Sequence, residues 1–481
     1  MEKGAKNRQP NILLVMTDQM RGDCMGIDGH PDVKTPYLDN LAARGVRYTN
    51  AYTACPSCIP ARCALHTGLK QENHGRVGYQ DRVPWEYPVT MAGELAKAGY
   101  YTQCVGKMHV HPLRNLMGFH HIELHDGYLH AYRNGGVPYN ENQRIADDYF
   151  YWLKKEMGID RDVTDGGIEC NSFVARPWMY EERLHPTNWV TDRSIDFLRR
   201  RDRSRPFFLM ASYLRPHPPF DAPECFFALY RDKELTPPVI GDWADEERMR
   251  RLGRFVDADT GSCDPELMRQ AQIGYYACIS HLDNQIGRLL DALRDDGSFQ
   301  DTVILFTSDH GELLGDHHTF RKTRPYQGSI RIPMIIAGAP GTAPGTVRDQ
   351  LVELRDILPT LVDLAGAEPP REIDGVSMLG DCGREYLHGE HSGGDLGNQY
   401  IVTKKDKYCW FMESGREQYF RLDSDPKELH DRIADPDCQE RIACLRQILI
   451  EELAGREEGY TDGERLIPGR PQKACLSFLS S

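Results

Sequence analysis

Two short apolar runs of the sequence end in residues that could bind a metal ion. NILLVMT is followed by Asp18 and Gln19, and TVILFTS is followed by Asp309 and His310. Two carboxylates, an amide oxygen and an imidazole form a donor set that suits Ca²⁺, Mg²⁺ or Mn²⁺. Either aspartate alone could simply cap the next turn. Two at equivalent strand ends favour a metal site.

Four further residues could supply positive charge beside that site. Lys107 and His109 follow the run YYTQCVG two residues apart, so they share one side of the chain if the extended backbone continues. His217 lies in LRPHPPF, and Lys322 lies in FRKTRPYQGSIRIP. A lone lysine is usually solvated, and a lone histidine is usually structural. Together they predict a cationic pocket, which a chain of net charge −14 would need to attract an anion.

The stretch ACPSCIPARC places three cysteines within nine residues, from Cys55 to Cys63. A redox pair of Cys55 and Cys58 lacks the compact βαβ context of thioredoxin-like sites, and half of a zinc site lacks a second CxxC. Numbered from Cys58, the stretch places Arg62 one helical turn later. We therefore expect Cys58 at the start of a helix, where an oxyanion is stabilised, and Cys55 and Cys63 as packing residues.

The elements that must position these residues alternate between strands and helices. Short apolar runs typical of strands covered on both faces begin at Asn11, Tyr100, Pro206, Thr302 and Ile332. This alternation predicts an α/β fold with a mostly parallel sheet, whose ligands gather at the carboxyl ends of the strands. Helical patterns lie between the runs, at 35–45 with a Thr35 cap, at 90–100 with a Thr90 cap, and at 265–293.

The pattern changes after the helix and proline-rich connection DILPTLVDLAGAEPPREIDG. From about residue 384 the chain consists of short strand-like pieces and then a helix over 438–453. We expect residues 1–380 to form the catalytic α/β domain. Residues 381–481 are expected to form a smaller α+β domain with an antiparallel sheet and an irregular tail.

Composition excludes several classes of protein. A pI near 5.7 argues against a nucleic-acid partner, and no apolar run approaches the roughly 20 residues that span a bilayer. The amino terminus MEKGAKNRQP has no apolar segment of the kind found in secretory signals. The 14 cysteines are scattered along the chain, which favours reduced thiols and a cytoplasmic location.

One motif of the chain resembles a known family signature. It is Cys58-Ile-Pro-Ala-Arg62 followed by Thr67-Gly68, and it resembles the signature of the type I, formylglycine-dependent sulfatases of the alkaline phosphatase superfamily. The resemblance implies a large mixed, mostly parallel sheet sandwiched by helices and a smaller C-terminal domain. It extends over nearly the whole chain, because further motifs occur in the order typical of the family: NILLVMTDQ, GKMH, RPHPPF, SDHGELLGDH followed by Lys322, DILPTLVDLAG and EQYFRLDSDPKEL.

The resemblance also implies a role for each candidate residue. Cys58 would be oxidised by a maturation enzyme to formylglycine, whose hydrate is the nucleophile. His217, or Lys322 beside it, would protonate the leaving alkoxide, and His109 would take the proton of the second hydroxyl. Arg62 would steady the hydrate, and Lys107 and Lys322 would neutralise sulfate oxygens. Asp18, Gln19, Asp309 and His310 would hold the cation, usually Ca²⁺, with Mn²⁺ or Mg²⁺ as alternatives.

We therefore predict hydrolysis of sulfate monoesters, either aryl sulfates or sulfated sugars, by a chain that could form homo-oligomers. Gln19 and His310 also resemble the phosphonate monoesterases and phosphodiesterases of the superfamily, whereas Lys107-x-His109 resembles sulfatases. A third hypothesis is a catalytically silent metal-binding or redox protein. The remaining histidines, His125, His317 and His391 among them, are expected at the surface or the substrate rim.

Overall fold

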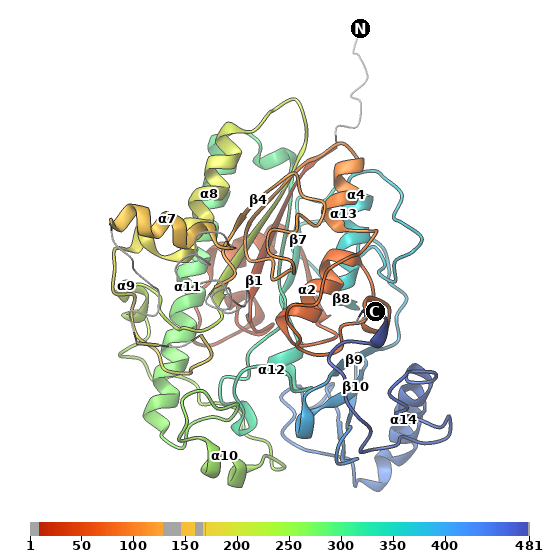
Figure 1. Ribbon diagram of the computed structural model, residues 1–481. Helices are drawn as coiled ribbons and strands as arrows, with labels where there is room; N and C mark the ends of the chain where they lie inside the picture. Colours follow the sequence, from red (N-terminus) through yellow and green to blue (C-terminus); the bar gives the residue numbers. More distant parts are fainter. Residues whose placement is uncertain (1–8, 128–145, 159–166, 169, 480–481) are drawn as a thin grey trace.

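The computed structural model describes residues 9–127, 146–158, 167–168 and 170–479 (Figure 1). Its larger sheet has eight strands in the order β4-β3-β5-β1-β6-β7-β2-β8, and β7 is antiparallel to both of its neighbours while the other pairs are parallel. The predicted mixed, mostly parallel sheet is confirmed. The strands are β1 Asn11–Asp18, β2 Gly45–Tyr52, β3 Tyr101–Gly106, β4 His121–Leu124, β5 Phe207–Pro216, β6 Thr302–Ser308, β7 Met334–Ala337 and β8 Thr346–Glu353.

Helices cover both faces of this sheet (Figure 1). Leu13 and Val15 of β1 pack into the core on one face, whereas Ile12, Leu14 and Met16 pack into the core on the other. Because both faces are covered, β1 is apolar without alternation. On the first face lie α1 Pro36–Arg44, α7 Asp148–Met157, α8 Pro186–Arg200 and α11 Pro265–Asp295, and on the second lie α2 Cys58–Thr67, α4 Met91–Lys97 and α13 Ile357–Leu364.

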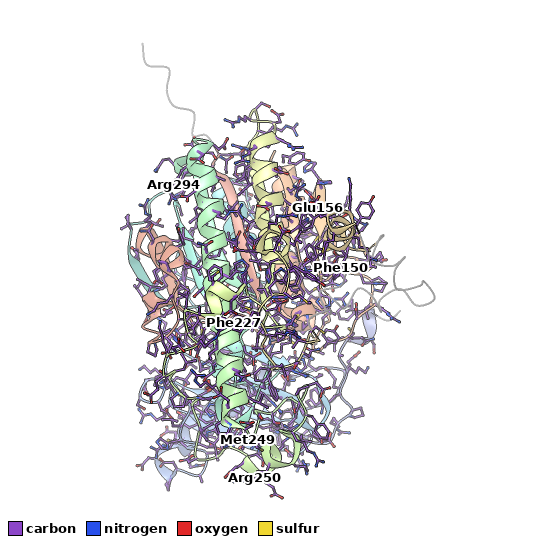
Figure 2. The ribbon with its side chains drawn as sticks, turned by 90° about the vertical axis from the view of Figure 1, so that its left-hand side faces the viewer. Phe150, Glu156, Phe227, Met249, Arg250 and Arg294 are labelled. Carbon is purple, nitrogen blue, oxygen red and sulfur yellow. The ribbon has the colours of Figure 1, made fainter. Side chains whose placement is uncertain are left out.

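The 31-residue helix α11 runs along most of one side of the molecule, as Figure 2 shows, and Arg294 lies near one end of it. Met249 and Arg250 belong to α10 Glu246–Leu252, near the other end. The shorter helices outside these layers are α3 Gln71–His74, α9 Glu224–Phe227 and α12 Gln327–Ile330.

Of the two helix caps predicted from the sequence, one is present in the structure and the other is not. Thr90 accepts a hydrogen bond from the amide of Gly93 and caps α4, as predicted. Thr35 makes no side-chain cap at α1. That prediction was wrong, because Asp283 of α11 instead accepts hydrogen bonds from the amides of Tyr37 and Leu38.

Three strands of the large sheet were not predicted from the sequence. β2 and β8 pair with each other at one edge, and β4 pairs with β3 at the opposite edge. Each of these strands mixes buried residues with partly or fully exposed ones, and arginines, glutamates and a histidine lie among them. A search for continuous apolar runs therefore finds the centre of the sheet and misses its margins.

The second sheet is antiparallel, in the order β12-β11-β10-β9, and lies beside α14 Gln439–Glu452 (Figure 1). One of its faces packs on α14, and the other packs on Tyr52, Tyr326 and Ile330 of the larger part. We propose that the boundary between the larger catalytic domain and the smaller C-terminal domain lies between residues 380 and 381. None of the described helices has the length and apolar character needed to cross a membrane. The strands are β9 Leu387–His391, β10 Asn398–Val402, β11 Lys407–Phe411 and β12 Glu417–Phe420.

Candidate active site

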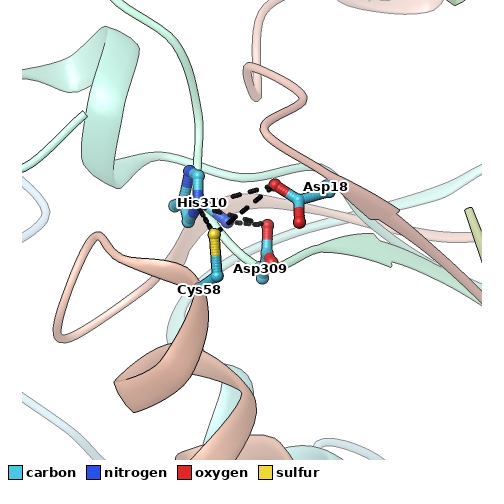
Figure 3. A group of neighbouring side chains, drawn as sticks. All are labelled: Asp18, Cys58, Asp309 and His310. Carbon is cyan, nitrogen blue, oxygen red and sulfur yellow. Dashed lines mark hydrogen bonds and ion pairs between the residues drawn. The ribbon is translucent and has the colours of Figure 1, made fainter. Parts of the chain in front are cut away.

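The site begins where the central strands β1 and β6 end. These strands pair in parallel with Thr17 opposite Ser308, so Asp18 and Asp309 emerge side by side. Helix α2 points its first residue, Cys58, at the same place, and Figure 3 shows the side chains of Asp18, Cys58, Asp309 and His310 directed toward one another. The topology therefore brings together residues almost 300 positions apart in the chain.

These four side chains form a possible metal site. One ligand atom from each of Asp18, Cys58, Asp309 and His310 lies within 4.8 Å of the others, and all four residues are buried. Cys58 Sγ lies 3.3 Å from His310 Nε2 and 3.8 Å from an oxygen of Asp18. Two carboxylates and an imidazole suit a divalent cation, so the donor chemistry fits a metal ion here.

Buried cations balance the two carboxylates. Arg62 Nε donates a hydrogen bond of 2.9 Å to Asp309, and Arg62 Nη2 lies 3.5 Å from Asp18. Lys107 Nζ forms an ion pair with the same Asp18. Burial alone would raise the pKa of Asp18, but the charges of Lys107, His217 and Arg62 lower it well below its usual value. The site thus favours the ionised form of Asp18 although this residue is buried.

Gln19 and Lys322 form the other wall of the site. Lys322 Nζ donates a 2.6 Å hydrogen bond to Gln19 Oε1 and lies 3.6 Å from Cys58 Sγ. The Gln19 amide nitrogen donates in turn to Glu312, a fully buried carboxylate that our sequence interpretation missed. Glu312 lies within the SDHGELLGDH motif, but nothing in its type or spacing distinguished it from a solvated glutamate.

Cys58 occupies an environment that favours an anion. Burial and the carboxylate of Asp18 raise the pKa of its thiol, but Lys107, Lys322 and His310 outweigh them and the pKa is lowered. As the first residue of α2, Cys58 also lies at the positive end of the helix dipole, as predicted. Cys55 and Cys63, which were expected to be packing residues, are buried free thiols.

His217 is placed by the loop after β5. Its amide donates to the carbonyl of Asp18, and its Nδ1 lies 2.8 Å from the carbonyl of Pro218. The loop is closed by Arg215, whose guanidinium donates two hydrogen bonds of 2.6 Å to Asp221. Burial, together with the charge of Lys322, lowers the pKa of His217 well below its usual value.

His109 does not continue the strand that leads to Lys107. Its φ is +60°, and its amide donates to the carboxylate of Asp126. Its ring meets the edge of Tyr79 with centroids 6.0 Å apart. The expectation of an extended backbone through Lys107 and His109 is therefore wrong, because Asp126 turns the chain at Met108 and His109.

Three histidines expected at the surface or the substrate rim are instead buried. The Nδ1 atom of His125 lies 3.2 Å from an oxygen of Asp147, and His125 is 1% exposed. His317 and His391 are exposed by 4% and 5%. Sequence spacing alone could not separate these buried histidines from solvated ones.

Comparison with known proteins gives the relationship of the chain. A family model described as sulfatase matches residues 10–367, and a model of the N-sulphoglucosamine sulphohydrolase C-terminal region matches residues 315–454. The first covers well over half of the chain. The chain belongs to the sulfatase family.

Individual relatives of this sulfatase agree. An arylsulfatase of Clostridium perfringens is 50% identical over 96% of this chain and 98% of its own. The multifunctional alkaline phosphatase superfamily protein PehA of Trinickia caryophylli is 31% identical over 89% and 90% of the two chains. Among solved structures, the phosphonate monoester hydrolase of Agrobacterium radiobacter covers 92% of this chain and 95% of its own, with a TM-score of 0.75 and 25% identity.

Proposed function

We propose that this sulfatase hydrolyses sulfate monoesters, aryl sulfates or sulfated carbohydrates, with Cys58 converted to formylglycine as its nucleophile. The observation that carries the proposal is the position of Cys58 Sγ, which lies 3.3 Å from His310 Nε2 and 3.6 Å from Lys322 Nζ at the start of a buried helix. The 50% identity to an arylsulfatase supports sulfate esters as the substrate class.

We propose that Asp18, Gln19, Asp309 and His310 hold a divalent cation, Ca²⁺ in the first place and Mn²⁺ or Mg²⁺ as alternatives. The oxygen-rich donor set supports a hard cation. Gln19 Oε1 already accepts from Lys322, so this amide oxygen faces the site. When bound, the ion supplies positive charge that stabilises developing negative charge at the reacting group.

Side chains of the protein bind and orient the reacting groups. Lys107 and Lys322 neutralise the sulfate oxygens, and Arg62 orients the group at position 58. A sulfate ester offers little electrophilicity, so positioning and charge stabilisation must supply most of the rate. Hydrated formylglycine supplies the attacking hydroxyl.

The two histidines would move the protons. We assign His217 to protonation of the leaving oxygen and His109 to removal of the proton that releases sulfate. Lys322 helps to hold His217 neutral in the structure. A sulfate bound between Lys107 and Lys322 would offset their charge and so raise the pKa of His217.

Three further expectations belong to this proposal. A formylglycine-generating maturation enzyme is the required protein partner, and the mature enzyme would act in the cytoplasm. A homo-oligomer is also compatible with the proposal. Size-exclusion chromatography with light scattering and fractionation of the native host test the last two expectations.

The decisive experiment joins mass spectrometry to turnover. The peptide around Cys58 from a host with the maturation enzyme should show replacement of the CH₂SH group by an aldehyde. The same preparation should hydrolyse an aryl sulfate faster than an aryl phosphonate, and a Cys58→Ala variant should hydrolyse neither. A large preference for the phosphonate would instead establish the phosphonate monoester or phosphodiester alternative, which the likeness to a phosphonate monoester hydrolase makes worth including.

A further inference from the structure

A second cavity lies between the loop that carries Lys322, helix α10 and the small sheet. Its volume is about 320 Å³, which is within the range of small-ligand pockets. Trp243 and Arg248 line it from the α10 side, Arg324 and Thr260 from the centre, and Phe411 and Arg416 from the small sheet. Three arginines from three separate segments therefore face one space.

Three carboxylates lie at this cavity beside its three arginines, so its charges balance in number. Arg248 and Arg324 share one carboxylate, Asp259, at 3.0 and 2.7 Å. Asp245 and Asp395 also line the cavity, and Asp245 accepts a hydrogen bond from the amide of Arg248 as the cap of α10. Burial lowers the pKa of Arg324 to about 10 in spite of Asp259, and the charges of Arg248 and Arg416 contribute.

Three hydrogen-bonding groups of the cavity are buried without a protein partner among the residues described. They are Arg248 Nη1, Thr260 Oγ1 and Arg324 Nε. Thr260 and Arg324 are only 1% and 4% exposed. Buried polar groups are nearly always satisfied in folded proteins, so unsatisfied donors that line the same cavity indicate a ligand with acceptor oxygens.

The cavity adjoins the active site through a short stretch of chain. Lys322 contacts Cys58, and the next residue, Thr323, donates its amide to the carbonyl of Pro56. Arg324 follows, at most about 7 Å along the chain from Lys322. His391 of β9 lies near enough to His310, Arg324 and Lys322 for their charges to influence it. The loop that places Lys322 at the active site therefore also supplies Arg324 to the cavity.

We propose that this cavity is a subsite for a second anionic group of the substrate, bound by Arg248, Arg324 and Thr260. The inference rests on the proposed function and names its substrate class, a sulfated saccharide that carries another sulfate or a uronate carboxylate. A guanidinium group can donate two parallel hydrogen bonds to a pair of oxygens of a sulfate or a carboxylate. Trp243 and Phe411 add apolar surface to the lining; Trp243 packs against Tyr326, and Arg416 stacks on Phe411 at 4.1 Å.

The test compares three disaccharides that share the scissile sulfate and carry a second sulfate, a uronate carboxylate or no second charge. The wild-type enzyme should show at least tenfold higher kcat/KM for a doubly anionic substrate than for the singly charged one, whichever second group it prefers. Arg248→Gln and Arg324→Gln should each remove most of that ratio. Arg250→Gln should preserve it, because Arg250 is 70% exposed and pairs with Glu246 on the same helix (Figure 2).

Equal kcat/KM for all three substrates in the wild type, or an unchanged ratio in the arginine variants, would overturn the subsite. If Arg324→Gln does not fold, the partly exposed Arg248 decides the question. Absence of any sulfate-ester turnover would overturn the proposed function instead. Calorimetry with the Cys58→Ala protein then tests the subsite separately. Tighter binding of a doubly anionic disaccharide than of the singly charged one supports the subsite, and equal binding of the two refutes it.

Discussion

Lys322 stands beside the proposed nucleophile and also holds Gln19 in place. We expect Lys322→Ala to lower kcat/KM for an aryl sulfate by roughly 100- to 1000-fold, the usual effect of removing one preorganised donor from a developing charge. Steady-state kinetics measure this effect. Lys405→Ala is the matched control, because Lys405 is exposed on the small domain and should leave the rate unchanged. A fall of less than threefold in the Lys322 variant would contradict its role.

Asp221 is a positioning residue for His217. It closes the loop through its two hydrogen bonds with Arg215 and is not one of the four residues of the possible metal site. We expect Asp221→Asn to lower kcat by about tenfold or more with little change in KM, because a misplaced proton donor slows the chemical step.

The identity of the leaving group separates positioning from general damage in this variant. An alkyl or sugar sulfate needs protonation of its leaving oxygen, whereas a nitrophenyl sulfate needs little. The Asp221 variant should therefore lose more activity on the former. Equal losses on both substrates would indicate only structural damage, and Asp192→Asn, a surface partner of Arg288, provides the control.

At the scale of elements, α1 depends on a carboxylate from another helix. Asp283 of α11 accepts the amides of Leu38 at 2.8 Å and Tyr37 at 3.2 Å. We expect Asp283→Ala to lower the free energy of unfolding by roughly 1–3 kcal/mol, because one buried and one partly buried backbone donor lose their acceptor. Asp283→Asn keeps an acceptor oxygen and should lose less. Urea unfolding measures both.

The same carboxylate makes this difference depend on pH. Burial raises the pKa of Asp283 to about 7, so between pH 4 and 7 the folded state binds more protons than the unfolded state. The wild type therefore loses stability as pH rises through that window, whereas Asp283→Asn does not lose this contribution. We expect the free energy of unfolding of Asp283→Asn, relative to that of the wild type, to be higher at pH 8 than at pH 4.5. A pH-independent difference would refute the raised pKa.

At the scale of the whole molecule, the end of the chain returns to the larger part. Val77 donates to the carbonyl of Ala474, and Leu476 donates to the carbonyl of Gly75. Cys475 and Leu476 are buried there. The tail that was expected to be irregular thus binds the segment just after α2 and α3.

Removal of residues 472–481 should therefore destabilise the larger domain as well as the small one. Each lost backbone hydrogen bond is worth roughly 1 kcal/mol, and exposure of Leu476 adds about 2 kcal/mol. We expect a fall of a few kcal/mol in the free energy of unfolding, measured by denaturant titration, and a parallel loss of activity at elevated temperature. A chain that ends at Leu479 serves as the control. Unchanged stability of the shorter chain would show that the tail is dispensable.

Much of this fold was predictable because the central strands are buried on both faces and helix patterns lie between them. β1, β3, β5 and β6 were predicted from continuous apolar runs. The edge strands β2, β4 and β8 were not, since partial exposure mixes polar residues into their sequences. The short strands of the small sheet were predicted because turn residues separate them.

The sequence by itself determined the family, the register that singles out Cys58, and the carboxylates at the ends of β1 and β6. Those features depend on residue types at short spacing, which a linear chain displays directly. Only the tertiary structure decided that Glu312 orients Gln19, that Asp126 turns His109 away from the strand, and that three arginines surround one cavity. These arrangements depend on contacts between segments tens to hundreds of residues apart, whose distances and burial no local pattern encodes.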